Sequence, residues 1–331
     1  MKGVFKIFAK VSLITMILAA ENAAGQSTRY EKAGKSFRVI GYLPVFGMQK
    51  NDVLNFDFGR VNYLNIAFVN PDSAADFTIP AHLSQTVTAA HDKHTKVLIS
   101  IGGGSAPAYY SKLMMDSLRV KLIDNLTKLS VDYNLDGIDV DLEGDRIDTN
   151  YEAFVTGLSA ALKSKGKLLT SAVASAYKLK YTDKALAAYD FINIMSYDKT
   201  GPWRPADEGP HAPYDMAVAD LDYWINTRRI APQKLNLGLP FYGYGFGPGA
   251  PAEISFKNLV ARYSGAENAD IITVTGGGKI HYNGRETIKN KTELALQKAG
   301  GVMVWQLLGD AEGDKSLLNT INNTINIHDK Y

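Results

Sequence analysis

The feature that most constrains the fold is a series of eight short apolar segments spread along the chain. Most are apolar at nearly every position, which is typical of parallel strands covered on both faces. Helical patterns separate them, so their order predicts repeated strand–helix–strand units. Eight such units predict a closed (β/α)8 TIM barrel, with a doubly wound open sheet as the alternative. The segments are residues 37–44, 61–69, 96–102, 137–143, 168–174, 190–197, 234–240 and 301–306.

Amphipathic patterns between these segments predict the helices. The longest runs from Tyr109 to Tyr133, with leucines recurring on one face. Residues 151–165 and 214–228 follow the same pattern, and 292–299 form a shorter helix. Trp224 falls inside one of these patterns, so we expect it in the core.

One connection is longer than the others. Residues 241–290, between the seventh and eighth predicted strands, contain a helical pattern near Phe256 to Tyr263. They also contain a glycine-rich tip flanked by strand-forming residues, which predicts a hairpin. We therefore expect a small insertion on the barrel, so that residues 36–331 form a single domain.

The N-terminal residues follow a different pattern. Lys2, Lys6 and Lys10 accompany an apolar run over residues 11–20, and small residues follow near Gly25. This arrangement predicts a signal peptide over residues 1–25, because the apolar run is too short to span a bilayer. A single anchoring or amphipathic helix is the alternative. We expect a protein without a membrane span, exported to the periplasm, the cell surface or the medium.

Composition excludes several kinds of chemistry. The chain has no cysteine, which rules out disulfides, thiolate catalysis and cysteine-ligated zinc. Its six histidines lack metal-ligand spacing, and we predict neither a metal nor a cofactor. The 36 basic and 34 acidic residues give a net charge of +2, so nothing favours a nucleic-acid partner. We expect a monomer.

The segment DGIDVDLEGD, residues 136–145, alternates acidic with apolar residues. Side chains alternate across a strand, so Asp139, Asp141 and Glu143 share one face. In a barrel the apolar face packs against the helices, which turns the acids inward. Carboxylates there lose hydration and repel one another, so they share protons and some pKa values rise. Glu143, nearest the C-terminal end of the strand, is the predicted proton donor.

Two other readings of this segment are weaker. A calcium site would need oxygen ligands in a loop, whereas this pattern is that of a strand. A solvated run of surface charge would not be threaded with branched apolar residues. Asp136 lies at the foot of the strand, and we expect a structural role for it.

At these residues the chain resembles family 18 of the glycoside hydrolases, the chitinase family. The family signature DGxDxDxE is matched over residues 136–143. Three further motifs occur in the family's order: SxGG at Ser100 to Gly103, MxYD at Met195 to Asp198, and a last strand with its tryptophan at Gly300 to Gln306. The resemblance runs from about residue 37 to 328.

The resemblance implies substrate-assisted hydrolysis with retention, an exception to the usual scheme of two carboxylates. Glu143 would protonate the glycosidic oxygen, and the substrate's own 2-acetamido oxygen would attack to close an oxazolinium ring. Asp141 would orient the acetamido N–H and stabilise the positive charge, while Asp139 would hold or share its proton. Tyr197 would hydrogen-bond the acetamido oxygen. A sugar without an N-acetyl group has no nucleophile, so the implied substrate contains N-acetylglucosamine.

Further residues are expected around the substrate. Trp305 would form an apolar floor under the reacting sugar. Tyr42 and Ser100 are placed to hydrogen-bond the inner aspartate, or else they only satisfy polar groups of the core. The other expected cleft residues are Met195, Asp198, Tyr242, and Trp203 as a platform beside a neighbouring sugar. His211 is placed no nearer to the substrate than the cleft rim.

The chain departs from the family pattern in three places. Leu142 precedes the glutamate and Gly144–Asp145 follow it, where many chitinases have an aromatic residue and an aromatic–proline pair. Tyr244 stands where an arginine is usual. The insertion is shorter than the α+β domain that deepens the cleft of many exo-acting members. We therefore expect a shallower, more open cleft.

Three functions remain open from the sequence. The first is hydrolysis of β-1,4-linked N-acetylglucosamine chains, as in chitin or chitooligosaccharides. The second is an endo-β-N-acetylglucosaminidase that cuts the chitobiose core of N-glycans with the same acid and the same oxazolinium chemistry. The third is an inactive chitinase-like sugar-binding protein, which the presence of Glu143, Asp141 and Tyr197 disfavours.

Overall fold

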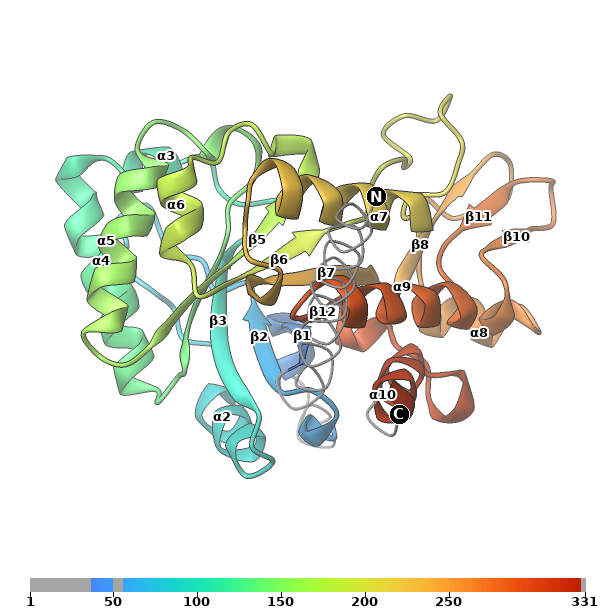
Figure 1. Ribbon diagram of the computed structural model, residues 1–331, viewed down its shortest axis with the longest axis horizontal. Coiled ribbons are helices and arrows are strands. Elements are labelled where there is room, and N and C mark those ends of the chain that lie inside the picture. Colours follow the sequence, from blue (N-terminus) through green and yellow to red (C-terminus); the bar gives the residue numbers. More distant parts are fainter. Residues whose placement is uncertain (1–36, 50–55, 329–331) are drawn as a thin grey trace, which may run out of the picture. The chain divides into compact units, whose positions relative to one another are not determined.

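Eight parallel strands close into a barrel in the computed structural model, which describes residues 37–49 and 56–328 (Figure 1). Around the barrel the order is β1-β2-β3-β4-β5-β6-β7-β12, and β12 pairs with β1 to close it. The predicted (β/α)8 barrel is confirmed, because closure excludes an open sheet. The strands are β1 (Arg38–Pro44), β2 (Tyr63–Ala67), β3 (Lys96–Gly102), β4 (Gly137–Asp141), β5 (Leu168–Ala174), β6 (Phe191–Met195), β7 (Leu235–Pro240) and β12 (Gly301–Trp305).

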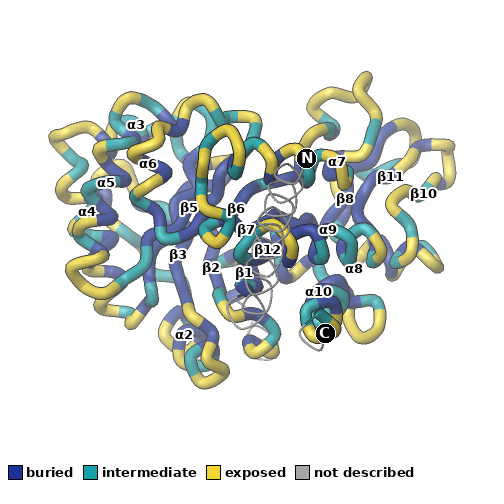
Figure 2. Tube along the Cα trace, in the orientation of Figure 1, coloured by how far each residue is buried: buried dark blue, intermediate teal, exposed yellow. Residues whose placement is uncertain are grey.

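The strand that carries the acids is buried along its whole length. Asp139 accepts hydrogen bonds from side chains of β1, β3 and β5, which can meet β4 in this way only inside the barrel. Its neighbours Ile138 and Val140 are fully buried and face the opposite way, towards the helices. Figure 2 shows the strands buried and the helices exposed on their outer side.

The helices between the strands differ from the prediction in their breaks and lengths. The predicted helix 109–133 is two helices, because Met115 is extended (φ −66°, ψ 156°) and ends the first one. Asp116 opens the second helix, where a negative charge is favourable, and this acid is the sequence signal for the break. The helices of the barrel layer are α2 (Leu83–His91), α3 (Tyr110–Leu113), α4 (Asp116–Asp132), α5 (Tyr151–Lys163), α6 (Asp183–Ala188), α7 (Tyr214–Asp222), α9 (Arg285–Lys298) and α10 (Leu317–His328).

Helix α7 continues as a π-helical segment, and helix α9 is longer than predicted. A π-helical segment, Tyr223–Thr227, continues α7 and carries Trp224, which is fully buried. The prediction that Trp224 is a core residue is confirmed. Helix α9 begins at Arg285, seven positions before the predicted start at residue 292, because its first two turns are mostly polar and lack the apolar periodicity that the prediction used.

A second sheet lies in the sequence between β7 and β12. Its four antiparallel strands have the order β10-β11-β8-β9, and helix α8 (Phe256–Arg262) follows β9. Gly276 and Gly277, at the tip between β10 and β11, have φ values of +108° and +90°, which glycine adopts without strain. The strands are β8 (Tyr242–Phe246), β9 (Glu253–Ser255), β10 (Ile271–Thr273) and β11 (Lys279–His281).

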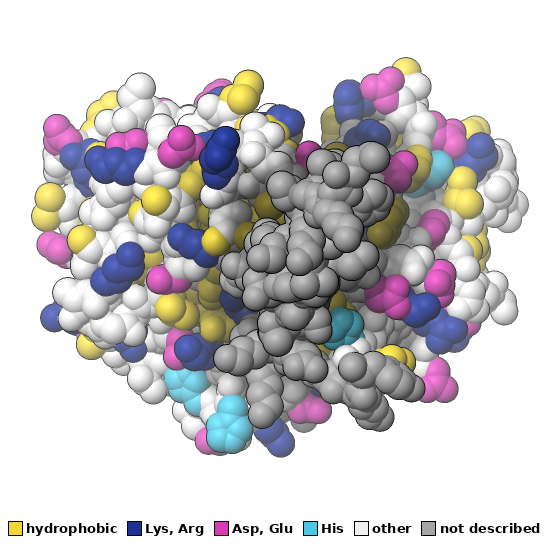
Figure 3. Space-filling model, in the orientation of Figure 1, with side chains coloured by type: hydrophobic (Ala, Val, Ile, Leu, Met, Phe, Trp, Pro, Cys, Tyr) yellow, Lys and Arg dark blue, Asp and Glu magenta, His cyan; other side chains and the backbone are white. Residues whose placement is uncertain are grey.

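One sequence prediction concerns residues that the structure does not describe. The predicted signal peptide, residues 1–25, lies outside the described residues. Within residues 37–49 and 56–328, no helix combines the length and the apolar character needed to cross a bilayer. On the face shown in Figure 3, basic and acidic side chains are interspersed, and neither charge forms a continuous field.

Candidate active site

A cavity of about 600 Å³ opens where the strands end. It is lined by the last residues of β1, β2, β3, β4, β6 and β12, namely Pro44, Ala67, Gly102, Asp141, Met195 and Trp305. The C-terminal face of such a barrel is where catalytic residues from different strands converge. The following side chains give this cavity its chemistry.

Asp139 lies below the cavity and is completely buried. Its Oδ2 accepts hydrogen bonds from Tyr42 Oη and Ser100 Oγ, both at 2.7 Å, and its Oδ1 accepts from Thr170 Oγ1 at 2.5 Å. Burial raises the pKa of Asp139, and the three hydroxyl donors oppose that rise because they stabilise the carboxylate. Asp139 is thus a buried acid with a nearly complete set of donors.

The support of Asp139 continues down the barrel. Tyr42 Oη also accepts from Asn193 Nδ2 at 3.1 Å, and Asn193 Oδ1 accepts from Asn236 Nδ2 at 2.9 Å. Asn236 Oδ1 in turn accepts from Arg38 Nε at 2.8 Å. An ordered chain of donors therefore runs through the barrel interior from Arg38 to Asp139.

Asp141 lies one pleat further along β4 and lacks such support. Its side chain is 4% exposed, and its Oδ1 has no hydrogen-bond partner among the described residues. Burial holds the pKa of Asp141 well above its usual range, and the negative charges of Glu143 and Asp139 add to this. Because an unsatisfied buried oxygen is costly, Asp141 is the strongest sign that a ligand with a hydrogen-bond donor completes this site.

Glu143 follows the end of β4 in an extended conformation (φ −125°, ψ 159°) and lines the cavity. Burial, reinforced by the charge of Asp198, raises the pKa of Glu143 to about 6, while Arg146 opposes the rise. A carboxyl group with such a pKa can donate a proton near neutral pH and take it back.

Tyr197 follows β6 and presents its hydroxyl group to the cavity. Its only hydrogen bond within the described residues is a long one, 3.9 Å, from Oη to the thioether sulfur of Met303. Burial and the charges of Asp141 and Asp198 hold the pKa of Tyr197 well above its usual range, so it remains a hydroxyl donor. A weak sulfur acceptor leaves that donor available for a ligand.

The aromatic wall of the cavity is built around Trp305. Its ring stacks on Phe68 at 5.5 Å with an interplanar angle of 26°, and meets the edge of Tyr42 at 5.7 Å. Met195 packs against the same aromatic cluster. Packed on two sides, the indole is held in one orientation and offers an apolar surface to the cavity.

Glycines explain why the third strand can approach the acids so closely. A Cβ atom on Gly102, whose φ is +104°, would lie 2.1 Å from the carbonyl oxygen of Asp141. A Cβ on Gly103 would lie 2.5 Å from the ring of Phe68. The two glycines of the SxGG segment are therefore required by the backbone of Asp141 and by the aromatic wall.

Asp198 lines the cavity beside Tyr197 and accepts a hydrogen bond from Tyr242 Oη at 2.5 Å. His211 Nδ1 lies 3.5 Å from the same carboxylate oxygen. His211, which the sequence placed no nearer to the substrate than the rim, lies further back: it is completely buried and packs against Tyr242 and Tyr244. Burial lowers its pKa, so the imidazole is neutral at neutral pH. Local sequence gave no periodic signal for this burial, because it depends on contacts with β8.

The predicted site residues fall into three groups. Ser100 and Asp139 lie behind the cavity, in the barrel core. Trp203 does not line the cavity; it is 53% exposed and meets Tyr244 edge-on at 5.2 Å. The predicted residues that line the cavity are Tyr42, Asp141, Glu143, Met195, Tyr197, Asp198, Tyr242 and Trp305.

Phe46, Phe68 and Glu253 are among the lining residues that the sequence analysis missed. Phe46 is 62% exposed just after β1, and Phe68 follows β2. For Phe46, the position shortly after the predicted strand 37–44 was a usable signal, whereas Phe68 fell inside the predicted segment 61–69. Glu253 reaches the cavity from β9 of the second sheet, and its place depends on strand pairing that the sequence did not reveal.

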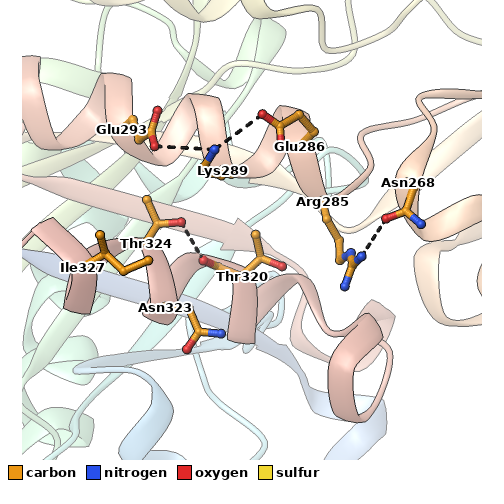
Figure 4. A pocket seen from close by; sticks show the side chains of 9 residues that line it. All are labelled: Asn268, Arg285, Glu286, Lys289, Glu293, Thr320, Asn323, Thr324 and Ile327. Atoms are coloured by element: carbon orange, nitrogen blue, oxygen red, sulfur yellow. Dashed lines mark hydrogen bonds and ion pairs between the residues drawn. The ribbon is translucent and has the colours of Figure 1, made fainter.

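A second hollow, of about 500 Å³, lies between α9 and α10 (Figure 4). Its charged side chains are already paired. Lys289 lies between Glu286 and Glu293, at 3.5 and 3.9 Å, and Arg285 donates to Asn268 at 2.6 Å. Nothing in this hollow resembles an activated nucleophile or a paired acid and base.

Within the described chain, no group of histidine and acidic side chains has the arrangement to hold a metal ion. The site is therefore the acidic cavity at the barrel mouth.

Comparison with known proteins agrees with this geometry. A family model described as glycosyl hydrolases family 18 matches residues 27–310. Among solved structures, the chitinase ChiB of Flavobacterium johnsoniae superposes with a TM-score of 0.81 and 33% identity, covering 88% of this chain and 94% of that one. A chitinase from Bacteroides thetaiotaomicron gives a TM-score of 0.78 and 30% identity, covering 88% and 97%.

Curated relatives are matched over shorter stretches. A probable chitinase 2 of Drosophila melanogaster is 32% identical over 173 residues, which is 46% of this chain and 35% of that protein. A chitinase-like effector of Moniliophthora roreri is 25% identical, and the match covers 58% of its length. The chain thus spans between about a third and three fifths of these two relatives.

Proposed function

The chain belongs to family 18 of the glycosyl hydrolases, a family of glycosidases, and on this premise we propose that it is a retaining hydrolase of β-1,4-linked N-acetylglucosamine chains. The observation that carries the proposal is the state of Asp141. This buried carboxyl group keeps an unpartnered oxygen inside a cavity, within one pleat of an acid whose pKa is raised to about 6. An acetamido N–H is a donor that fits this oxygen.

The proposed reaction uses the substrate as its own nucleophile. Glu143, protonated, gives its proton to the glycosidic oxygen while the acetamido carbonyl oxygen attacks the anomeric carbon. The bond to the leaving sugar breaks and an oxazolinium ring closes. Attack within one molecule needs only positioning and charge complementarity from the protein. Water then opens the ring from the side of the departed sugar, with Glu143 as the base, so the configuration is retained.

The surrounding residues support each of these needs. Asp141 accepts the acetamido N–H and complements the positive ring, and Asp139 lies next to it on the same face of β4. Tyr197, with only a weak sulfur acceptor, donates to the acetamido oxygen. Trp305 underlies the reacting sugar. We propose that Trp203, outside the cavity, contacts a sugar further along the chain.

Relatives with at least 30% identity support chitin or chitooligosaccharides as the substrate, because the chitinases of Flavobacterium johnsoniae and Bacteroides thetaiotaomicron are among them. We propose further that the protein works as an exported monomer. Export rests on the predicted signal peptide, whose removal is tested by sequencing the N-terminus of protein recovered outside the cytoplasm.

The substrate is tested by incubating the protein with N-acetylated chitooligosaccharides and, separately, with a high-mannose glycoprotein, and identifying products by mass spectrometry. We expect shorter N-acetylglucosamine oligomers with the β configuration at the new reducing end, seen by NMR at early times. Glycans released with a single N-acetylglucosamine, without cleavage of the oligomers, would establish the endo-β-N-acetylglucosaminidase instead. Binding of the oligomers without any cleavage would establish the inactive sugar-binding protein.

A further inference from the structure

The turn that follows Glu143 has little of its own to fix its shape. It is a single 3₁₀ turn, Gly144–Arg146, in which the backbone N–H of Arg146 donates to the carbonyl oxygen of Glu143 at 3.2 Å. Gly144 has a φ of +60° and no side chain, and the side chain of Asp145 is exposed. The orientation of the acid therefore depends on contacts that other segments make with this turn.

Arg146 ties the turn to the loop that follows β3. Its Nη2 donates to the carbonyl oxygen of Ala106, and Ala106 N donates to the carbonyl oxygen of Gly103 at 2.8 Å. The same loop lies beside the acid, because a Cβ atom on Gly104 would come within 3.5 Å of Glu143 Oε1. Arg146 thus joins the backbone that carries Glu143 to the loop that lies beside its carboxyl group.

The charged and titratable groups around Glu143 act on it with opposite signs. Burial and then the negative charge of Asp198 raise the pKa of Glu143, and the positive charge of Arg146 opposes them. The tyrosines nearby stay neutral, since burial holds their pKa values well above the usual range. The groups that face the acid are Asp141 of β4, Arg146 of the following turn, Tyr181 between β5 and α6, and Tyr197 and Asp198 after β6.

We infer that Arg146 is a positioning residue for the catalytic acid: it holds the turn after Glu143 against the β3 loop, and its charge favours the ionised form of the acid. This inference rests on the proposed function. In the proposed reaction Glu143 first gives up a proton and then takes one from water, so both of its forms are needed. Burial and Asp198 favour the protonated form, and Arg146 keeps the ionised form within reach. Arg146 thereby sets the pH range in which the acid works.

Lys180 offers a matched control, because it is a second cation on the same turn. Its Nζ donates to the carbonyl oxygen of Gly144 at 2.8 Å and pairs with Asp145 Oδ1 at 3.0 Å. The exposed carboxylate of Asp145 already balances this charge. Loss of Lys180 therefore removes support from the turn without removing the charge that acts on Glu143.

The test measures kcat/KM on fully N-acetylated chitotetraose as a function of pH for wild type, R146M, R146K and K180M. In R146M, the fall of kcat/KM at high pH should begin about half a pH unit higher than in wild type, so that activity at about pH 8 relative to the optimum rises about threefold. R146K keeps the charge, and K180M keeps Arg146, so both should retain the wild-type fall. At the optimum, kcat of R146M should be lower than that of R146K, which can still donate to Ala106.

Three results would overturn the inference while leaving the proposed function intact. The first is an R146M profile that falls at the same pH as wild type. The second is a shift of the same size in K180M, because support of the turn would then be responsible and not the charge of Arg146. The third is a shift of the same size in R146K, which has the charge.

Failure of the proposed function would look different, since none of the proteins would cleave the tetrasaccharide. The acid is then observed directly, by NMR titration of isotope-labelled glutamate side chains, with the Glu143 signal identified by its absence in E143Q. We expect its midpoint in R146M to lie about half a pH unit above that of wild type, and the midpoint in K180M to match wild type. Equal midpoints in R146M and wild type would refute the role of Arg146 independently of catalysis.

Discussion

The two hollows of the molecule have similar volumes, about 600 Å³ at the barrel mouth and about 500 Å³ between α9 and α10. They differ in how their charges are balanced. Between the helices, Lys289 has an acid on each side and Arg285 is held by neighbouring oxygens. At the barrel mouth, Asp141 has an unpartnered oxygen and Glu143 a raised pKa. Size therefore does not distinguish a functional cavity from an inert one here, whereas unbalanced charge does.

This contrast has an energetic reason. Exposed ion pairs such as those of Lys289 contribute little to stability, and water would replace them at small cost. A buried carboxyl group with an unpartnered oxygen costs stability, and in the proposed function a substrate donor completes it.

The largest effect is expected from E143Q. The amide keeps the shape of the side chain but has no proton acidic enough to transfer to the leaving oxygen, and general acid catalysis contributes about 10² to 10⁴ in rate. We expect kcat on chitooligosaccharides to fall at least a thousandfold, with oligosaccharide binding retained in calorimetric titration. A variant that keeps more than a few per cent of the wild-type rate would remove Glu143 from its proposed role.

The next effect is that of D141N, which should move activity and stability in opposite directions. Loss of the charge that complements the oxazolinium ring should lower kcat by about a hundredfold. Removal of a repelling acid from between Asp139 and Glu143 should raise the melting temperature at neutral pH by a few degrees. A lower melting temperature in D141N would show that Asp141 stabilises the unliganded protein. The barrel-mouth cavity would then not differ from the α9–α10 hollow in the way its charges are balanced.

The pH dependence follows from Glu143, whose pKa of about 6 lies above the ordinary value for glutamate. Because the acid must be protonated, kcat/KM should fall about tenfold per pH unit above pH 6.

The raised pKa of Glu143 also means that the folded state binds the proton more tightly than the unfolded chain does. Stability is therefore favoured at low pH and is lost as pH rises from the unfolded value through about 6. Thermal unfolding across this range should show E143Q gaining up to roughly 2 kcal/mol over wild type at the higher pH. A constant difference between the two proteins would contradict this.

The smallest effect is expected at the other hollow. K289M removes the cation shared by Glu286 and Glu293 and should change the free energy of unfolding by less than about 0.5 kcal/mol. The value of kcat/KM should stay within about twofold of wild type. A tenfold loss of activity in K289M would mean that a change in the α9–α10 hollow alters the active site at the barrel mouth.

The barrel and its acids could be predicted because their signals are local. Continuous apolar segments mark the buried parallel strands, and the alternation from Asp139 to Glu143 marks which face turns inward. The remaining features depend on contacts between distant segments. His211 is buried by β8, and Glu253 reaches the cavity only because β9 pairs with β8. Met114 is buried and Met115 is 48% exposed, a difference that the sequence does not reveal, although Asp116 marks the start of α4.

The hydrogen-bond chain from Arg38 to Asp139 links parts of the polypeptide that are synthesised at different times. It passes from β1 to β7, then to β6, back to β1 and finally to β4. On the ribosome, Tyr42 and Asp139 emerge long before Asn193 and Asn236. When β4 has been synthesised, Asp139 and Asp141 are present, but Asn193 and Asn236, which order Tyr42, are not. The catalytic apparatus is thus assembled late, when the second half of the barrel arrives.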